Sequence, residues 1–140
     1  MVRVNNLFIL FSVAVLLCWA CNPAETKLQQ YVVEGEALYL QHCSNCHQKN
    51  GKGLGLVYPP VDQSDFMDQH LEDVICLIKY GRKGEITVNG KTYHQPMPGV
   101  PSLTELEVAE ICTFLYNHWG RNRGIIEVPM VTQTLDKCTP

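Results

Sequence analysis

Residues 43–47 form a C-x-x-C-H motif, and this motif restricts the fold more than any other feature of the chain. Two thiols three positions apart on one helical turn can each add across a vinyl group on one edge of a porphyrin. The imidazole that directly follows the second thiol can then bind iron beneath the ring. The motif therefore predicts one covalently attached haem held by Cys43, Cys46 and His47, with the rest of the chain positioned around it.

Two other kinds of site also use a C-x-x-C pair. A closed zinc site needs four ligands, usually from a second pair, but Cys76, Cys112 and Cys138 stand singly. A dithiol redox motif normally occurs in a βαβ context, whereas the sequence around residues 43–47 is helical and glycine-rich. Haem attachment is favoured, and the zinc and dithiol alternatives remain open here.

Residues 1–20 have the pattern of a signal peptide. Arg3 gives a weakly positive start, and the apolar run from Leu7 to Leu17 is too short to span a bilayer comfortably. Ala20 precedes Cys21 and the sequence then turns polar, which resembles the cleavage site of a bacterial lipoprotein with Cys21 as the lipid-bearing residue. Ordinary cleavage near Ala20 and an uncleaved anchor are the alternatives.

These features predict an exported protein that faces the periplasm and is held at a bacterial membrane by lipid. Covalent haem attachment in bacteria takes place outside the cytoplasm, so the two motifs support each other. Residues 21–140 contain ten Lys and Arg against fourteen Asp and Glu. This balance argues against nucleic-acid binding, which favours strongly basic domains.

We expect the chain to have four segments: a signal peptide (1–20), a lipid-anchored polar tether (21–33), one domain (34–120) and a C-terminal tail (121–140). The domain begins with a helix over residues 34–42, in which Gly35 and Tyr39 share one face. The tail has weak patterning, and we assign it no firm structure.

A glycine-rich loop over residues 48–60 follows the motif and ends in Pro59-Pro60. Glycine permits close backbone approach, so we expect this loop to wrap a porphyrin edge. The His47 ring nitrogen that does not bind iron needs an acceptor to fix its orientation. The carbonyl of Pro59 is the candidate for that role.

Residues 68–80 are predicted to form a middle helix ended by Gly81, with Leu71, Val74, Ile75 and Ile78 facing inward. Residues 85–93 predict a short β-hairpin, because Asn89-Gly90 between β-forming residues is a strong two-residue turn signal. A last helix is predicted to end at Gly120, with a capping box formed by Thr104 and Glu107.

Met97 lies between Pro96 and Pro98. Proline stiffens a loop, and a stiff loop could hold the thioether toward the open face of the iron. Methionine is often only a core filler, but its flanks and its place after the hairpin favour Met97 as the second axial ligand. His94 in the same loop, another histidine or an open position are the alternatives.

Taken together, these motifs resemble those of class I c-type cytochromes over residues 34–120. The features that carry the resemblance are Gly35 with Tyr39, the C-x-x-C-H motif, Pro59-Pro60, the hairpin, Met97-Pro98 and the last helix with Phe114. Residues 84–98 and the following helix also look like membrane-bound cytochromes and cytochrome subunits of bacterial dehydrogenases.

The resemblance implies an all-α cytochrome c fold with one haem c. Its first and last helices would cross where Gly35 and Tyr39 meet Ile111, Phe114 and Leu115. Three cysteines depart from the usual pattern, so one disulfide is plausible in this compartment. Cys76–Cys112 and Cys112–Cys138 are the two pairings considered, and buried free thiols are the alternative.

We expect an electron-transfer protein that is not itself an enzyme, because His47 and Met97 would leave no iron position for a small-molecule substrate. Its partners would be redox proteins, a dehydrogenase or an oxidase, approached near Lys49 and Lys52. Lys79, Arg82 and Lys83 could add a basic rim, although a merely solvated surface is the simpler interpretation. The rival hypotheses are a haem enzyme or sensor with an open sixth position, such as a small peroxidase, and a fixed subunit of a larger oxidoreductase.

Overall fold

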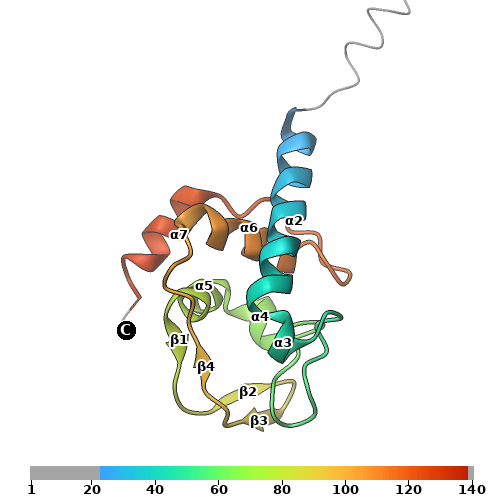
Figure 1. Ribbon diagram of the computed structural model, residues 1–140, viewed down its shortest axis with the longest axis vertical. Helices are drawn as coiled ribbons and strands as arrows, with labels where there is room; N and C mark the ends of the chain where they lie inside the picture. Colours follow the sequence, from blue (N-terminus) through green and yellow to red (C-terminus); the bar gives the residue numbers. More distant parts are fainter. Residues whose placement is uncertain (1–22, 139–140) are drawn as a thin grey trace, which may run out of the picture.

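The computed structural model describes residues 23–138, in which helices surround a buried core and two small sheets lie at one end (Figure 1). The predicted signal peptide and the predicted lipid site at Cys21 lie outside these residues. The helices are α2 (Pro23–His42), α3 (Ser44–His47), α4 (Asp65–Gln69), α5 (Leu71–Tyr80), α6 (Glu105–Leu115) and α7 (Val128–Leu135). The strands are β1 (Gly81–Arg82), β2 (Ile86–Val88), β3 (Lys91–Tyr93) and β4 (Met97–Pro98).

Helices α2 and α6 pack together around Gly35. A Cβ atom added at Gly35 would lie 2.0 Å from the carbonyl oxygen of Glu110 and 2.8 Å from the Cβ of Phe114. One turn later, the rings of Tyr39 and Phe114 have their centroids 5.4 Å apart. Only glycine allows α2 to approach the backbone of α6 this closely, so Gly35 sets where the two helices meet.

The segment predicted as a polar tether is helical from Pro23 onward. Helix α2 is 20 residues long and continues without a break from Pro23 to His42. Lys27 forms an ion pair with Glu127, whose carboxylate oxygen lies 2.8 Å from Nζ, and so links the first half of α2 to the start of α7. Residues 23–33, predicted as part of a polar tether, are therefore part of helix α2.

The predicted middle helix is interrupted at His70, which separates α4 from α5. Ser64 caps α4 by accepting a hydrogen bond from the backbone N–H of Met67. The backbone of His70 then leaves the helical region, with φ −129° and ψ 50°. The inward face predicted for this segment is confirmed, because Leu71, Val74, Ile75 and Ile78 are all buried.

The β-hairpin is confirmed. Strands β2 and β3 pair antiparallel, and Asn89 and Gly90 both have positive φ in the turn between them. The hairpin is held to α4 because Asn89 and Asp65 exchange hydrogen bonds between their side chains and backbone N–H groups. A second antiparallel pair joins β1 to β4, which places Arg82 opposite Met97.

Helix α6 has the predicted capping box, in which Thr104 and Glu107 each accept a hydrogen bond from the other's backbone N–H. The helix ends at Leu115 rather than near Trp119. The side chain of Asn117 donates to the carbonyls of Thr113 and Gly124, and accepts from the N–H of Gly124. These bonds turn the chain back, so the longer helix was wrong.

The segment predicted as a C-terminal tail contains a helix, α7. Helix α7 begins with Pro129 in its first turn and buries Val131, Thr134 and Leu135 against the core. The buried Ile126 precedes it, and its backbone N–H donates to the hydroxyl of Thr113. The apolar residues of the tail thus have a packing role that the sequence pattern alone did not specify.

A disulfide joins Cys76 on α5 to Cys138 after α7. Neither of the two pairings considered from the sequence is present, because Cys112 is a fully buried free thiol on α6. Cys76 and Cys138 are 62 residues apart, and α7 packs against both α5 and α6. The disulfide therefore fastens the end of the chain to the middle helix.

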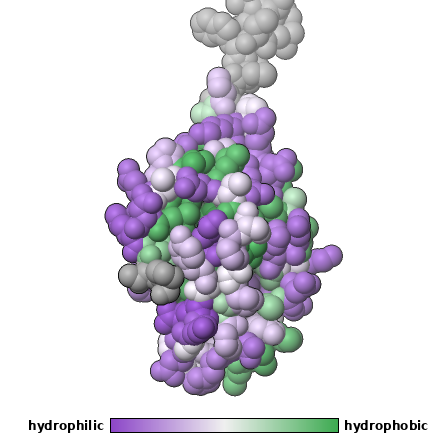
Figure 2. Space-filling model, turned by 60° about the vertical axis from the view of Figure 1, so that its left-hand side comes forward, coloured by the Kyte–Doolittle hydropathy of each residue, from purple (hydrophilic) through white to green (hydrophobic). Residues whose placement is uncertain are grey.

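The surface of the described residues is mixed. On the face drawn in Figure 2, hydrophobic residues reach the surface in a limited area and hydrophilic residues surround them. Within residues 23–138, none of the helices has the length and apolar character needed to cross a membrane.

Candidate functional site

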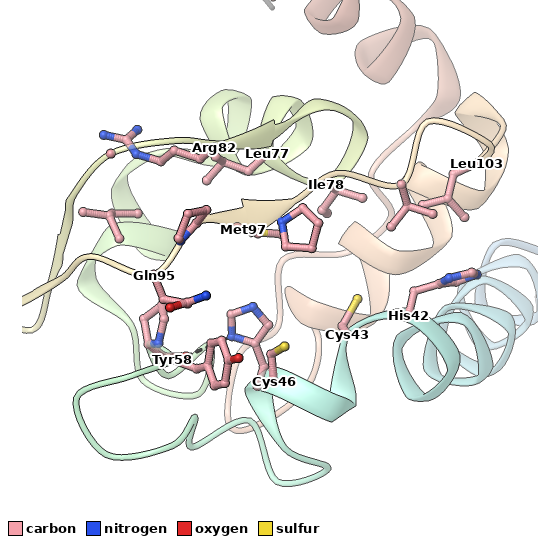
Figure 3. Close-up of a pocket in the computed structure, with 17 residues that line it drawn as sticks. His42, Cys43, Cys46, Tyr58, Leu77, Ile78, Arg82, Gln95, Met97 and Leu103 are labelled. Carbon is pink, nitrogen blue, oxygen red and sulfur yellow. Dashed lines mark hydrogen bonds between the residues drawn. The ribbon is translucent and has the colours of Figure 1, made fainter.

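An apolar pocket lies between the C-x-x-C-H segment and strand β4. Cys43, Cys46 and His47 line one side, and Met97 with its flanking prolines lines another. Figure 3 shows Cys43 and Cys46 on the helical side of the pocket and Met97 on the strand that passes across it. Leu77 and Ile78 of α5 and Leu103 before α6 close its walls. Segments within residues 42–47, 58–59, 77–86 and 95–103 therefore meet at one cavity.

The helix–turn arrangement of residues 42–47 positions the two thiols. Helix α2 ends at His42, and Cys43 then serves as the N-cap residue of α3. The backbone N–H of Cys43 donates to the carbonyl of Tyr39, and that of His47 donates to the carbonyl of Cys43. This local winding brings both thiols and the imidazole to the same pocket.

His47 has the orientation and protonation that a metal ligand needs. Its Nδ1 lies 2.9 Å from the carbonyl oxygen of Pro59. Because a carbonyl only accepts, Nδ1 carries the proton and Nε2 keeps the lone pair. Burial lowers the pKa of His47, although the hydrogen bond to Pro59 opposes this in part, and the lowered pKa favours the neutral ring.

The thiol of Cys43 does not have the character of a redox dithiol. Burial, together with the nearby Cys46, raises its pKa to about 12. Reactive cysteines in C-x-x-C redox motifs have lowered pKa values instead. In residues 23–138 there is also no group of three or more His, Cys, Asp or Glu side chains that could hold a metal ion. The zinc and dithiol alternatives are therefore disfavoured.

A second apolar cavity adjoins the first and deepens the site. It shares Cys43, His47, Pro59 and Met97 with the first cavity and extends inward to Tyr39, Met67 and Leu115. The two cavities enclose about 820 and 570 Å³ of empty space, including solvent at their openings. His47 and Met97 thus border both parts of one continuous apolar site.

The other candidate ligand, His94, does not line either cavity. Its side chain is 75% exposed, and its Nδ1 lies 3.7 Å from a carboxylate oxygen of Glu85. His42 does line the first cavity and comes directly before Cys43. Of the two candidate ligands in the loop after the hairpin, Met97 and His94, only Met97 lines the pocket.

Sequence reasoning missed several residues around the pocket. Tyr58, Arg82 and Gln95 supply its polar lining, and Arg82 also donates to the carbonyl of Glu85. The side chain of Arg121 donates to Asp68 and to the carbonyls of Val61 and Ser64, which fixes the segment after Pro59. The contacts of Arg121 span more than 50 residues, so no local pattern in the sequence indicated them.

The residues present fit a covalently attached haem c. Two thiols lie at the rim, a neutral imidazole has a free Nε2, a thioether borders the same cavity, and the remaining lining is mostly apolar. An apolar lining matches the body of a porphyrin, and imidazole with thioether is one of the axial ligand pairs found in cytochromes c.

Comparison with known proteins agrees with this fit. The family description "Cytochrome c" matches residues 32–119. Cytochrome c-552 of Thermus thermophilus is 31% identical over 62% of this chain and 69% of its own length. A second Thermus thermophilus cytochrome c-552, from strain ATCC 27634, is also 31% identical, and the alignment covers 61% of it.

A third relative is the cytochrome subunit of fructose dehydrogenase from Gluconobacter japonicus. It is 29% identical over 71% of this chain, but the alignment spans only 21% of that subunit. The matched family region includes the whole pocket and ends before α7 and Cys138. On this evidence the chain belongs to the cytochrome c family: it is a class I c-type cytochrome with a covalently bound haem c.

Proposed function

We propose that this protein is a one-electron carrier whose single haem c is attached through Cys43 and Cys46 and has His47 and Met97 as its axial ligands. The observation that carries the proposal is that His47 and Met97 border the same two-part apolar cavity. Bound haem c supplies one-electron exchange between the ferric and ferrous states of its iron.

The residues of the chain would have distinct tasks. His47 would bind through Nε2, while Pro59 holds its ring in one orientation. Met97 would occupy the other axial position and leave no place for oxygen or peroxide. The apolar lining excludes water, and a thioether with a low-dielectric pocket favours the less charged ferrous form. We therefore expect a higher reduction potential than with two histidine ligands.

Redox partners would approach the loop that follows the motif. Lys49 and Lys52 are exposed there, and Leu54, Leu56 and Val57 expose about half or more of their surface beside them. Exposed apolar groups bordered by charges are typical of transient protein interfaces. This loop directly follows the two thiols and the imidazole in the chain, so we place the docking surface for redox partners here.

The proposed setting is an exported electron-transfer chain at a bacterial membrane. The support is the signal-peptide pattern of residues 1–20 and the lipoprotein-like site at Cys21, both in the sequence alone. Such an anchor would raise the effective concentration of the carrier near membrane-bound dehydrogenases or oxidases. We propose no enzymatic activity for the chain itself.

A second candidate is a fixed electron-transfer role within a larger oxidoreductase. The similarity to a fructose dehydrogenase cytochrome subunit favours it. The ligands and the cavity would be the same in both cases, and only the partner would differ. Recovery of this chain in a stable complex from detergent-solubilised membranes would support the second candidate, and recovery of a free monomer would support the first.

The ligand assignment is tested by spectroscopy of holoprotein made in a host that attaches haem c. The oxidised protein should show the weak far-red sulfur–iron absorption band, and the reduced protein should bind carbon monoxide slowly. Met97→Ala should abolish the band, lower the reduction potential and open the site to carbon monoxide. His94→Ala is the matched control and should change none of these. An unchanged spectrum in Met97→Ala would refute the assignment.

A further inference from the structure

The segment that carries Met97 is fastened to the end of helix α5. Strand β4 pairs with β1, the two residues that directly follow α5, so that Gly81 lies opposite Pro98. The backbone N–H of Val100 then donates to the carbonyl of Ile78, at 2.9 Å. The chain on the C-terminal side of Met97 is therefore bonded through its backbone to the last turn of α5 and to the two residues after it.

The fit between the two segments is close. A Cβ atom added at Gly99 would lie 2.4 Å from the carbonyl carbon of Tyr80 and 2.5 Å from the nitrogen of Gly81. Backbone therefore meets backbone at this point, and no side chain separates Met97's loop from α5. A small change in how the loop sits on α5 would be transmitted directly to Met97.

Lys79 joins the same two segments through its side chain. Its Nζ lies 2.8 Å from the carbonyl oxygen of Pro101 and 2.5 Å from that of Leu103. Both carbonyls belong to the stretch between β4 and α6. Hydrogen bonds from a charged donor are stronger than those between neutral groups, so this ammonium group holds the loop after Met97 on two acceptors.

Lys79 also interacts electrostatically with Glu107 in the first turn of α6. Hydrogen bonds from Thr104 are the main cause of the lowered pKa of Glu107, and Lys79 contributes electrostatically to the same shift. Lys79 also lies in the last turn of α5, where a positive charge is stabilised by the helix dipole. The ammonium group of Lys79 is therefore engaged with two backbone carbonyls and is only partly exposed.

We propose that Lys79 is a positioning residue for Met97, acting by clamping residues 101–103 onto the end of α5. The inference depends on the proposed ligation by Met97. The same helix supplies Leu77 and Ile78 to the pocket wall. Lys79 thus fixes the position of the loop that carries Met97 relative to the pocket wall formed by α5.

The test compares Lys79→Met with Lys79→Arg and Lys83→Met in the holoprotein. Lys79→Met keeps most of the side-chain volume but removes both hydrogen bonds and the charge. Lys79→Arg keeps the charge and donors. Lys83→Met removes an exposed lysine four residues further on, which makes no side-chain hydrogen bond or ion pair within residues 23–138. Lys79→Leu, which also lacks a donor and a charge, replaces Lys79→Met if that variant does not accumulate.

Two measurements separate positioning of Met97 from general stability. In increasing guanidinium, loss of the far-red sulfur–iron band is compared with loss of helical circular dichroism. In Lys79→Met, the gap between the guanidinium concentration that abolishes the band and the higher concentration that unfolds the helices should be wider than in the parent protein. Carbon monoxide binding to the reduced form should be at least about tenfold faster, since loss of even one charge-assisted hydrogen bond changes an equilibrium by about that factor. Lys79→Arg should recover part of both effects, and Lys83→Met should match the parent protein.

The outcomes distinguish this inference from the proposed function. If the parent protein shows the band, and Lys79→Met matches it in both measurements, the role of Lys79 is overturned while the Met97 assignment stands. If the parent protein lacks the band and binds carbon monoxide at once, Met97 is not a ligand and both proposals fail.

Discussion

Gly35 illustrates how one residue can fix the contact between two helices. Alanine favours a helix over glycine by about 1 kcal/mol, so Gly35→Ala would stabilise an isolated α2. In the folded protein its Cβ would collide with the backbone of Glu110. Backbone cannot move aside cheaply, and overpacking typically costs about 1–3 kcal/mol. We expect Gly35→Ala to lower the free energy of unfolding by about 2 kcal/mol.

Urea unfolding of the holoprotein measures this effect. Glu36→Ala, at an exposed neighbouring position in the same helix, is the control and should be nearly neutral. A Gly35→Ala variant as stable as its parent would mean that α2 and α6 are not held in close contact at this point.

Glu107 gives the fold a pH dependence at acidic pH. Hydrogen bonds from the backbone and then the side chain of Thr104 lower its pKa below the ordinary glutamate value. A carboxylate with a lower pKa in the folded state stabilises the protein above its unfolded-state pKa, and that contribution is lost as the pH falls through the lowered value. The free energy of unfolding should therefore fall between about pH 5 and pH 3.

Glu107→Gln should weaken this dependence, and Thr104→Ala should do the same because it removes the hydroxyl partner. Equilibrium unfolding at a series of pH values decides between these outcomes, and an equal slope in Glu107→Gln and its parent would rule out the capping box as its source.

At the scale of elements, signals within a few residues were predictable from the sequence. The Asn89-Gly90 turn and the Thr104–Glu107 capping box both follow from side chains that act on their own local backbone. The C-x-x-C-H motif is local in the same sense. The hydrogen bond between His47 and Pro59 spans only 12 residues and follows from the need of the ring for an acceptor.

Elements that depend on distant contacts were not predictable. Helix α7 is short, and what stabilises it is burial of Val131 and Leu135 against α5 and α6. The start of α2 has little amphipathic pattern, so the sequence did not distinguish it from a tether. The choice of Cys138 as partner of Cys76 depends on where α7 docks, which no spacing along the chain specifies.

The disulfide should contribute strongly to the docking of α7. It closes a loop of 62 residues, for which the chain-entropy model gives about 4 kcal/mol. Replacing both Cys76 and Cys138 by serine should lower the free energy of unfolding by up to that amount. The loss should appear first as faster amide hydrogen exchange in α7, since α2 and α6 keep their own contact.

Thiol counting checks the pairing itself. In denaturant without reductant, holoprotein with both Cys18 and Cys21 replaced by serine should expose one reactive thiol, because Cys112 is the only cysteine of residues 23–138 that is outside both the disulfide and the haem motif. Cys112→Ala should bring the count to zero. Three thiols in the parent would contradict the Cys76–Cys138 bond.

For the whole molecule, the continuous α2 changes how an anchored protein would be held. A helix of 20 residues is about 30 Å long. Pro23 begins α2 at one end, and His42 at the other end lines the pocket. Figure 1 shows the first turns of α2 rising beyond the other helices, while α3 and the strands lie at the opposite end. If lipid is attached at Cys21, α2 acts as a rigid spacer and not as a flexible tether.

The prediction is that the pocket and the exposed loop at Leu56 are kept away from the membrane surface, where redox partners can reach them. Nitroxide labels at Glu25→Cys and Leu56→Cys, in vesicles with nickel chelated at the lipid headgroups, test this by spin relaxation. The label at position 25 should relax strongly and the label at position 56 weakly. Freely dissolved nickel should affect both, since both positions are exposed.

The prediction attributes the distance between the pocket and the membrane to an unbroken α2, so the decisive variant interrupts this helix. Gln30 is exposed, and proline at this position removes a helical hydrogen bond and introduces a clash at a cost of about 3 kcal/mol. With Gln30→Pro the domain should pivot, and membrane-bound nickel should then relax the label at position 56 more strongly. Gln30→Ala keeps the helix and should behave as the parent. Equal relaxation of both labels in the parent would show that the domain lies against the membrane, and the spacer role of α2 would be untenable.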